Sequence, residues 1–352
     1  MMNNEEAQRY SRQIMLPEIG YPGQQKLRDA SVLMIGAGGL GCPVLQYLVA
    51  AGAGTIGIVD DDLVELSNLH RQILFQQADL GRPKAEVAKE KLMLLNPHVS
   101  ITAYPVRFSP ANATALCMEY DLVIDGSDNF DTRYLVNDTC VDLDKPLVFG
   151  SIFRFEGQVS VFNYLGGPEY RDLFPEPPAT GSIPNCNEIG VLGVLPGIIG
   201  CHMANEALKI ICGMGETLSG RLMTIDALTS RTAFFDIPKQ ESRKQFSPSA
   251  ELANMKNTNR IPELQFEQLS HWMQRSPDAL CLIDVREAWE YEDHNMGGIN
   301  IPLYELSQRI DEIPEHQKLV FCCQNGQRSK MAVQLLTPLR AGEMYSLKDG
   351  LR

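Results

Sequence analysis

The sequence predicts an α/β protein with a doubly wound parallel sheet, followed by a second, smaller α/β domain. In the first part of the chain, short apolar runs typical of strands alternate with helical stretches, an order that favours a parallel sheet with helices on both faces. The first run, residues 31–35, leads directly into a glycine-rich turn and a helix. A polar stretch then separates a shorter set of strands. We therefore expect a first domain at residues 1–237, a linker at 238–260 and a second domain at 261–352.

Length and composition narrow the classes of protein. The 352 residues suit about two domains, and a hydrophobic content of 44% is enough for their cores. A net charge of −13 argues against nucleic acid or an anionic membrane as a partner. We expect no signal peptide, and the longest apolar region, residues 189–199, is too short and too interrupted by Pro196 and glycines to span a bilayer. Nine cysteines without a disulfide framework indicate a reducing, cytoplasmic location.

The glycine turn has the spacing of a mononucleotide-binding fingerprint. Gly36 permits a tight turn, Gly38 lets a phosphate approach the backbone, and Gly41 lets the helix pack closely on the strand. The next apolar run ends in Asp60, about twenty residues on, where a ribose-binding carboxylate belongs. These features predict a Rossmann-like nucleotide site, and the alternative is a glycine-rich turn that binds nothing.

Apolar runs and helical periodicity place the other elements of the first domain. We expect parallel strands at residues 32–35, 55–59, 101–104, 122–125 and 147–149. We expect helices at residues 43–51, 84–95 and 111–119, after a short helix around residues 9–13 and a Pro/Gly-rich connection over residues 17–23. Beyond these we expect an antiparallel strand at residues 155–164, an ordered loop at 172–187, a helix at 196–211 and a hairpin of strands 222–225 and 232–235.

Polar residues crowd the connection that follows the second strand. They are Asp60, Asp61, Asp62, Asn68, Arg71, Gln72 and Lys84. Arg71 and Lys84 could neutralise a triphosphate, although each charge alone is typical of a solvated surface. Asp128 follows the strand at residues 122–125, at the sheet edge where ligands bind, and its carboxylate suits a Mg²⁺ that also holds phosphate oxygens. Together they indicate phosphoryl or nucleotidyl transfer.

Six motifs in this order resemble the ubiquitin-activating enzyme superfamily, in its bacterial MoeB/ThiF/HesA branch, over roughly residues 5–236. The motifs are Arg9-Tyr-Ser-Arg12-Gln13, Gly36-Ala37-Gly38-Gly39-Leu40-Gly41, Asp60-x-Asp62, Ser67-Asn68-Leu-His-Arg71-Gln72, Gly81-Arg-Pro-Lys84 and Asp128-Asn129. The resemblance implies ATP-dependent adenylylation of the C-terminal glycine of a small β-grasp sulfur-carrier protein that ends in Gly-Gly, of the MoaD/ThiS type.

The same resemblance implies the roles of single residues. Asp60 would bind ribose, and Arg71 and Lys84 would bind phosphates. Arg71 would also be catalytic, and so would Asp128, which would hold Mg²⁺ near the α-phosphate. Arg12 would reach the γ-phosphate in a neighbouring subunit, so the resemblance implies a homodimer. The remaining nucleotide-binding positions would be Gly36, Gly38, Gly39, Gly41, Asp62, Asn68 and Gln72.

The sequence departs from this family at its structural zinc. Relatives hold the ion on two Cys-x-x-Cys pairs, the first expected at Glu169-Tyr-Arg-Asp172 and the second within residues 238–250. Neither place has a cysteine, and no Cys-x-x-Cys spacing occurs elsewhere. We therefore expect no zinc.

Cys186 lies in the Pro-rich loop, near where relatives have a cysteine that bonds covalently to the carrier. It is either a reactive, catalytic thiol or a small residue that packs the loop, and the sequence leaves both open. The cysteines in predicted helices are expected in the core. They are Cys42, Cys117, Cys140, Cys201 and Cys212.

In the second domain, strands are expected at residues 280–284, 318–322 and 344–347. The loop Cys323-Gln-Asn-Gly-Gln-Arg328-Ser329 joins the second of them to a helix at residues 329–336. Its N–H groups and the helix N-terminus would lower the pKa of a cysteine at the mouth of the loop, and Arg328 would add a fixed charge. Cys322, on the strand, should point away into the core. The alternative is an ordinary turn with a buried cysteine.

With Asp284-Val-Arg-Glu287 and Gly297-Gly-Ile-Asn-Ile-Pro302, this loop resembles the rhodanese (sulfurtransferase) domain over roughly residues 262–352. The resemblance implies that Cys323 is catalytic and carries a persulfide. Relatives continue with a Gly-Gly-x-x-x-Trp stretch where this sequence has Asp349-Gly-Leu-Arg352, so we expect a short or missing closing turn.

The leading interpretation is one enzyme that adenylylates the carrier and then makes a thiocarboxylate with the Cys323 persulfide sulfur, supplied by a donor such as a cysteine desulfurase. The alternative is a carrier-activating enzyme whose rhodanese domain only docks partners. Activation of a tRNA-borne carboxylate is disfavoured by the acidic charge, and a nicotinamide oxidoreductase by Arg71, Lys84 and Asp128. The sequence leaves open whether the carrier serves molybdopterin, thiamine or another product.

Overall fold

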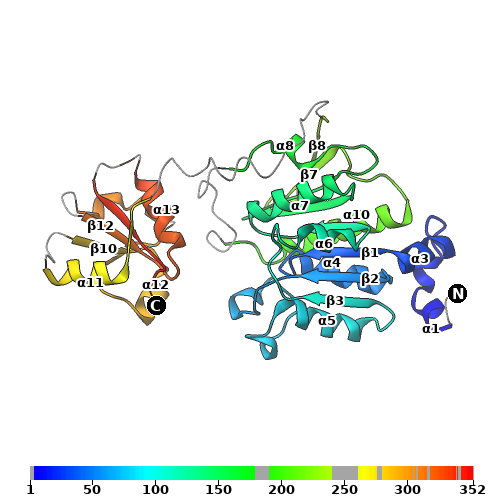
Figure 1. Ribbon diagram of the computed structural model, residues 1–352, viewed down its shortest axis with the longest axis horizontal. Coiled ribbons are helices and arrows are strands. Elements are labelled where there is room, and N and C mark those ends of the chain that lie inside the picture. Colours follow the sequence, from blue (N-terminus) through cyan, green and yellow to red (C-terminus); the bar gives the residue numbers. More distant parts are fainter. Residues whose placement is uncertain are drawn as a thin grey trace. The chain divides into compact units, whose positions relative to one another are not determined.

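The computed structural model divides into two compact units, coloured from blue to green and from yellow to red (Figure 1). It describes residues 4–178, 190–239, 261–275, 280–303, 305–306, 308–314, 318–337, 339 and 342–351. Within these ranges, no helix combines the length and the apolar character needed to cross a membrane. The predicted limits of the two domains stay predictions, since residues 240–260 lie outside the described ranges.

An eight-stranded sheet forms the larger unit, in the order β3-β2-β1-β4-β5-β6-β7-β8. The first five strands in this order are parallel, and β6, β7 and β8 extend the sheet antiparallel. The strands are β1 (Ser31–Ile35), β2 (Thr55–Val59), β3 (Ser100–Tyr104), β4 (Leu122–Asp125), β5 (Leu147–Phe153), β6 (Glu156–Phe162), β7 (Arg221–Asp226) and β8 (Arg231–Asp236). The predicted change from parallel to antiparallel pairing is confirmed.

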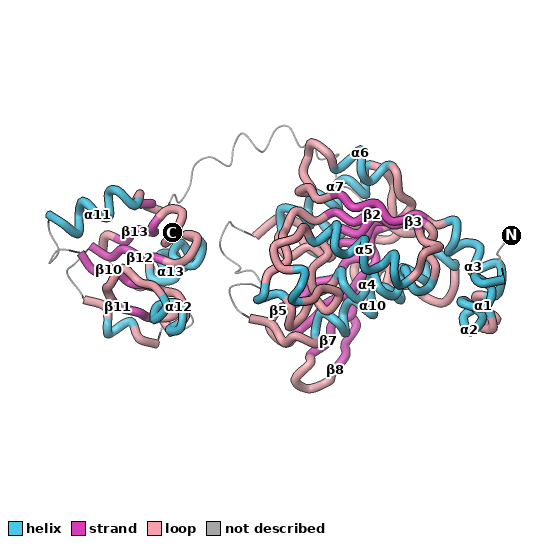
Figure 2. The backbone as a smooth tube through the Cα atoms, turned by 90° about the horizontal axis from the view of Figure 1, so that it is seen from below, coloured by secondary structure: helices cyan, strands magenta, loops and turns pink. Residues whose placement is uncertain are grey.

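Helices cover both faces of this sheet, which confirms the doubly wound class (Figure 2). On one face, α4 (Gly41–Ala51), α5 (Lys84–Leu95) and α10 (Leu195–Cys212) pack on Val32 and Met34 of β1. On the other face, α6 (Ala113–Met118) and α7 (Phe130–Asp142) pack on the alternate residues Leu33 and Ile35. The other α-helices in the described part of this unit are α1 (Asn4–Arg9), α2 (Ser11–Ile14), α3 (Gly20–Asp29) and α8 (Tyr170–Leu173).

Two segments differ from the expectation. The predicted connection over residues 17–23 is instead partly helical, because α3 begins at Gly20, where a proline in the first turn is tolerated. Sequence reasoning also missed α7, whose N-cap Asn129 accepts a hydrogen bond from the Thr132 N–H at 2.9 Å. The buried side of α7 includes Thr132, Asn137 and Thr139, so it has no continuous apolar stripe.

The smaller unit is a five-stranded parallel sheet in the order β11-β10-β12-β13-β9. Its strands are β9 (Glu263–Leu264), β10 (Leu280–Asp284), β11 (Ile299–Asn300), β12 (Lys318–Cys322) and β13 (Met344–Leu347). Its helices are α11 (Phe266–Arg275), α12 (Ala288–Asp293) and α13 (Gln327–Leu336). The three predicted strands are confirmed, whereas the two-residue strands and α11 and α12 were not predicted.

The cysteines of the helices are buried with one exception. Cys42, Cys117, Cys140 and Cys212 are buried, as predicted. Cys201 is exposed, so its assignment to the core is wrong. It lies on α10, whose buried residues include Gly200 and Met203, and it falls on the other side of that helix. Residues 179–189, which include Cys186, lie outside the described residues. The start of the predicted loop, residues 172–173, is instead the end of α8 (Tyr170–Leu173).

Candidate functional site

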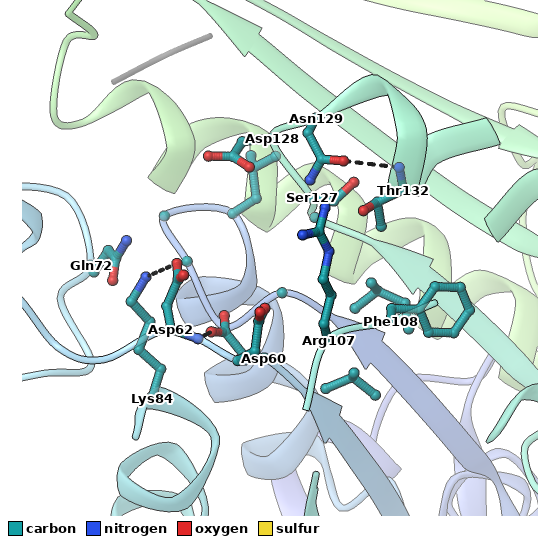
Figure 3. Close-up of a pocket in the computed structure, with 18 of the residues that line it drawn as sticks. Asp60, Asp62, Gln72, Lys84, Arg107, Phe108, Ser127, Asp128, Asn129 and Thr132 are labelled. Atoms are coloured by element: carbon teal, nitrogen blue, oxygen red, sulfur yellow. Dashed lines mark hydrogen bonds and ion pairs between the residues drawn. The ribbon is translucent and has the colours of Figure 1, made fainter. Parts of the chain in front are cut away.

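A cavity of about 290 Å³ opens at the carboxyl edge of the larger sheet, beside the ends of β1, β2, β3 and β4 (Figure 3). Parallel α/β sheets bind ligands at this edge. Of the predicted site residues, the cavity is lined by Gly36, Gly38, Gly39, Asp60, Asp62, Arg71, Gln72, Lys84 and Asp128. Three separate connections of the chain thus meet at one place, as the motifs predicted.

The glycine loop has the geometry that its spacing implies. Gly36 has φ +88°, in the region that favours glycine, and a Cβ there would crowd the carbonyl of Gly126. A Cβ on Gly41 would overlap the carbonyl oxygen of Gly36, so only glycine lets α4 start this close to β1. Gly41 therefore packs against the Gly36 carbonyl at the start of α4, and it is not among the residues that line the cavity.

The Asp60 carboxylate is tied to this loop at the end of β2. Its two oxygens accept hydrogen bonds from the main-chain N–H groups of Ala37, at 2.7 Å, and of Asp62, at 2.9 Å. Burial raises the pKa of Asp60 to about 6, although Lys84 and these two N–H groups act in the opposite direction. Each oxygen keeps a further lone pair for a ligand.

Lys84 and Asp62 point toward each other at the cavity wall (Figure 3). The Lys84 Nζ lies 2.7 Å from Asp62 Oδ2, and the lysine side chain is 6% exposed whereas that of Asp62 is 69% exposed. An ammonium group held at the first residue of α5, with an exposed partner, can exchange that partner for a phosphate oxygen at small desolvation cost.

Arg71 and Gln72 reach the cavity from the turn that follows the 3₁₀ helix Leu66–Asn68. Arg71 donates a hydrogen bond to the Ser67 carbonyl at 3.1 Å. Gln72 is 4% exposed, and its Oε1 has no hydrogen-bond partner in the described part of the chain. A buried amide oxygen without a partner beside a cavity is typical of a site that binds a polar ligand.

Besides Gly41, two other predicted nucleotide-binding residues do not reach the cavity. Asn68 is buried and caps its own turn, since its Oδ1 accepts the Glu65 N–H at 3.3 Å. Arg12 lies on α2 at the opposite edge of the sheet, because the neighbouring Gln13 donates to the carbonyl of Ala51. Ala51 ends α4, which spans about 16 Å from the glycine loop.

The turn after β4 supplies the other side of the cavity. Asp128 is exposed there, and none of the described residues pairs with its carboxylate. Beside it, three buried atoms have no hydrogen-bond partner within the described ranges: Asp125 Oδ2, Ser127 Oγ and Arg133 Nε. Burial also raises the pKa of Asp125. The cavity therefore has unsatisfied polar groups on both sides, which suits a polar ligand such as a nucleotide.

Sequence reasoning missed several lining residues. Arg107 and Phe108 follow β3, and Thr132 and Arg133 lie in the first turn of α7. The guanidinium group of Arg133 lies 5.4 and 5.6 Å from the ring centres of Phe130 and Phe149. The one sequence signal that could have identified these residues was their position after a predicted parallel strand, because such residues lie at the ligand-binding edge of the sheet.

The Cys323 loop of the smaller unit differs from the expectation in two ways. Cys323 is 0% exposed and packs in the core, so it does not stand open at the mouth of the loop. The Arg328 guanidinium is held by Glu290 through two bonds of 2.6 and 2.7 Å, so its charge is neutralised by a residue that the loop motif does not contain. The Sγ of Cys323 accepts a hydrogen bond from the Ser329 N–H at 3.3 Å.

The two adjacent cysteines face opposite sides of the small sheet. Cys322 packs in the cluster that includes Leu264 and Leu347, and Cys323 in the cluster that includes Phe321 and Ile301. The prediction that Cys322 points away from the loop into the core is confirmed. Burial raises the pKa of the Cys322 thiol far above its usual range, so this thiol stays protonated.

At the place of the relatives' first zinc pair, Glu169 is the N-cap of α8 and Asp172 lies in its first turn. The Glu169 N–H donates to Asp172 Oδ2 at 2.9 Å, and Arg171 makes two 2.7 Å bonds to Asp138. Among the described residues no group of three or more His, Cys, Asp or Glu side chains could hold a metal ion. Residues 240–260 lie outside those ranges, so the expected absence of zinc stays a prediction.

Known proteins resemble both units. A model of the ThiF family matches residues 10–247, and a model of the rhodanese-like domain matches residues 266–352. The "Sulfur carrier protein adenylyltransferase" of Thermus thermophilus is 56% identical over 229 residues, which cover 64% of this chain and 84% of that protein. "Adenylyltransferase and sulfurtransferase MOCS3" of Anopheles gambiae is 41% identical over 369 residues, covering 96% of this chain and 83% of that protein.

The crystal structure of E. coli MccB with ATP has a TM-score of 0.59 at 22% identity, covering 68% of this chain and 73% of that chain, which shows a shared fold. The fold and the cavity thus define a doubly wound α/β unit with a glycine-loop site, joined in one chain to a rhodanese-like unit. The chain belongs to the ThiF family, whose model covers more than half of its length.

Proposed function

We propose that this chain uses ATP to adenylylate the C-terminal glycine of a small β-grasp sulfur-carrier protein, and then converts the adenylate to a thiocarboxylate with sulfur carried on Cys323. The observation that best supports this proposal is that the glycine loop, Arg71, Lys84 and Asp128 meet at one cavity in a chain that also has a rhodanese-like unit. The MOCS3 relative, named for both activities, aligns over nearly the whole chain.

In this proposal the groups at the cavity have separate roles. Asp60 accepts hydrogen bonds from ribose hydroxyls with its remaining lone pairs. Lys84 leaves Asp62 and, with Arg71, neutralises phosphate oxygens, while the glycine loop lets the phosphates approach the backbone. The carrier's terminal carboxylate oxygen attacks the α-phosphorus, an acyl-phosphate bond forms, and pyrophosphate leaves with the electron pair of the broken P–O bond.

A Mg²⁺ ion fits the turn after β4. The Asp128 carboxylate is exposed at the cavity and unpaired by the described residues, and oxygen ligands are those that Mg²⁺ prefers. Asp128 would hold the ion, which would supply positive charge to the phosphate oxygens.

The sulfur step follows from the acyl adenylate. The terminal sulfur of a Cys323 persulfide attacks the carbonyl carbon, a carbon–sulfur bond forms, and AMP leaves. A small-molecule thiol then attacks the Cys323 sulfur, which breaks the S–S bond, releases the thiocarboxylate and leaves a mixed disulfide on Cys323. A further molecule of the thiol reduces that disulfide and restores the Cys323 thiol. The persulfide sulfur would come from an upstream donor such as a cysteine desulfurase, in the cytoplasm.

We extend the proposal to a homodimer. Arg12 lies at the edge of the sheet opposite its own cavity, so it can act on ATP only in the cavity of another subunit. In that arrangement its exposed guanidinium would reach the γ-phosphate of the neighbouring subunit.

The proposal is tested by exchange of labelled pyrophosphate into ATP, with and without a purified carrier that ends in Gly-Gly. Exchange is expected only with the carrier, because the carboxylate is the nucleophile that makes the step reversible. A carrier that lacks its last glycine is the matched control. Tight binding of NAD without binding of ATP would contradict the proposal.

A specific observation favours a second candidate function, in which the smaller unit only docks partners. Cys323 has no exposed surface, and Arg328 is paired with Glu290. In this case the chain would adenylylate the carrier but would depend on free sulfide for thiocarboxylate formation.

Nucleotide affinity is expected to fall as the pH drops through about 6. Burial raises the Asp60 pKa to about 6, and a protonated carboxyl loses acceptor capacity for ribose. Affinity is therefore full well above that pH and lost below it. Calorimetric titration of ATP between about pH 5 and about pH 8 measures this. Asp60→Asn should bind weakly with a flat profile, and an equally steep profile in that variant would assign the dependence to another group.

Purified protein is expected to contain no stoichiometric zinc, because Glu169 and Asp172 stand at the first pair position and bond within α8. Elemental analysis of protein prepared without chelators checks this. About one zinc per chain would contradict the expectation and would require ligands not identified from the sequence.

A further inference from the structure

Behind the Cys323 thiol, two buried serine hydroxyls form a short chain. Ser329 Oγ lies 3.6 Å from Cys323 Sγ, within hydrogen-bonding range for the large sulfur atom, and 2.9 Å from Ser346 Oγ. Ser329 and Ser346 are both 0% exposed. Ser329 lies in the first turn of α13 and Ser346 lies on β13, so the two hydroxyls come from different elements.

The available partners indicate a direction for these hydrogen bonds. Among the described residues, Ser329 Oγ is the one hydrogen-bond partner of the Ser346 hydroxyl, backbone carbonyls included. A buried hydroxyl keeps its proton in a hydrogen bond, so Ser346 donates to Ser329. The proton of Ser329 therefore cannot go to Ser346, and its two remaining acceptors are the Gly326 carbonyl at 3.0 Å and Cys323 Sγ.

The Ser329 hydroxyl can donate to a different acceptor in each protonation state of the Cys323 thiol. While Cys323 is protonated, its S–H donates to Ser329 Oγ and the serine proton lies on the Gly326 carbonyl. When the thiol ionises, the Ser329 hydroxyl rotates and donates its hydrogen bond to the thiolate, which also accepts a hydrogen bond from the Ser329 N–H at 3.3 Å. A hydroxyl that already accepts a hydrogen bond is a stronger donor.

We propose that Ser346 is a positioning residue for the sulfur-transfer step: by donating to Ser329, it directs the Ser329 hydroxyl to the ionised sulfur of Cys323. The inference rests on the proposed role of Cys323 as the sulfur-carrying residue. Ser346 itself does not touch the reacting sulfur.

The cationic groups around the loop are paired or exposed, so the buried donors close to the sulfur are the Ser329 N–H and the serine hydroxyls. Arg328 of α13 pairs with Glu290 of α12, and Arg286 pairs with Asp284 at the end of β10 at 2.7 Å. The other titratable groups near the loop are Cys322 on β12, the half-buried Glu287 before α12, and the exposed Lys348 and Asp349 after β13.

The test is the pH dependence of Cys323 alkylation in the full-length protein, with iodoacetamide and peptide mass spectrometry to separate Cys323 from the other thiols. Ser346→Ala is expected to raise the midpoint by about half to one pH unit, because the Ser329 hydroxyl is then no longer directed to the ionised sulfur and its hydrogen bond to that sulfur is weakened. Ser346→Thr, which keeps the hydroxyl, should titrate like the wild type. Thr337→Ala, which removes another hydroxyl on the same unit, is the matched control.

A double-mutant cycle separates a chain of hydrogen bonds from a general disturbance of β13. Ser329→Ala should raise the midpoint by itself, and adding Ser346→Ala to it should raise the midpoint no further. The inference is overturned by an unchanged midpoint in Ser346→Ala, by an equal rise in Ser346→Thr, or by additive shifts in the double variant. Alkylation requires neither ATP nor carrier, so these outcomes stand even if the chain does not transfer sulfur.

Discussion

Cys323→Ala is expected to abolish persulfide formation and to lower thiocarboxylate formation at least about a thousandfold, while carrier adenylylation stays at the wild-type rate. The variant removes the atom to which the transferred sulfur would be bonded. The adenylylation cavity is lined by residues of the larger unit alone. Mass spectrometry of the carrier, with a persulfide donor and without added sulfide, measures the loss.

Cys322→Ala is the matched control for this prediction. Cys322 is the adjacent residue, is 1% exposed, and has a thiol pKa that burial raises, so it should not replace Cys323. Cys186→Ala should leave persulfide formation and adenylylation intact and at most slow the release of sulfur to the carrier. Wild-type thiocarboxylate formation by Cys323→Ala would assign the smaller unit to docking.

Asp128→Ala is expected to lower carrier-dependent pyrophosphate exchange by about two to three orders of magnitude, with a smaller effect on ATP binding. Its carboxylate is the exposed, unpaired acid on the turn after β4, so its loss should remove the metal position but leave the glycine loop, Asp60 and Lys84 in place. Exchange rates at several Mg²⁺ concentrations, with ATP affinity by calorimetry, separate the two effects.

Asp131→Ala is the control for the loss of one negative charge near the cavity. Asp131 lies in the first turn of α7, three residues on, and is exposed without lining the cavity. It should exchange pyrophosphate like the wild type. Full exchange by Asp128→Ala, or an equal loss in Asp131→Ala, would contradict the assigned metal role.

Sequence reasoning predicted those parts of the fold that depend on local patterns. The runs at residues 55–59, 122–125 and 280–284 are strands with the predicted bounds, because β-branched and apolar residues bounded by charged or turn residues specify buried parallel strands. In contrast, α7 was missed because tertiary packing buries its polar Thr132 and Asn137, which leaves no apolar stripe to detect.

In the candidate site, too, features with a local sequence signal were predicted and features set by tertiary packing were not. The glycine loop, Asp60 and Lys84 were predicted because spacing along the chain carries their signal. The pairing of Arg328 with Glu290 joins residues 38 positions apart, and the contact of Ser329 with Ser346 joins residues 17 apart on different elements, so neither follows from a motif. The burial of Cys323 likewise depends on the packing around the loop rather than on its sequence.

The central claim is that one polypeptide both activates the carrier and supplies its sulfur. The direct test incubates the wild-type chain with ATP, a carrier ending in Gly-Gly and a persulfide donor labelled with heavy sulfur, and measures the intact mass of the carrier. We predict that one terminal oxygen is replaced by one labelled sulfur, and only when ATP and donor are both present. Accumulation of carrier adenylate without labelled sulfur, in the presence of an active donor, would contradict the account.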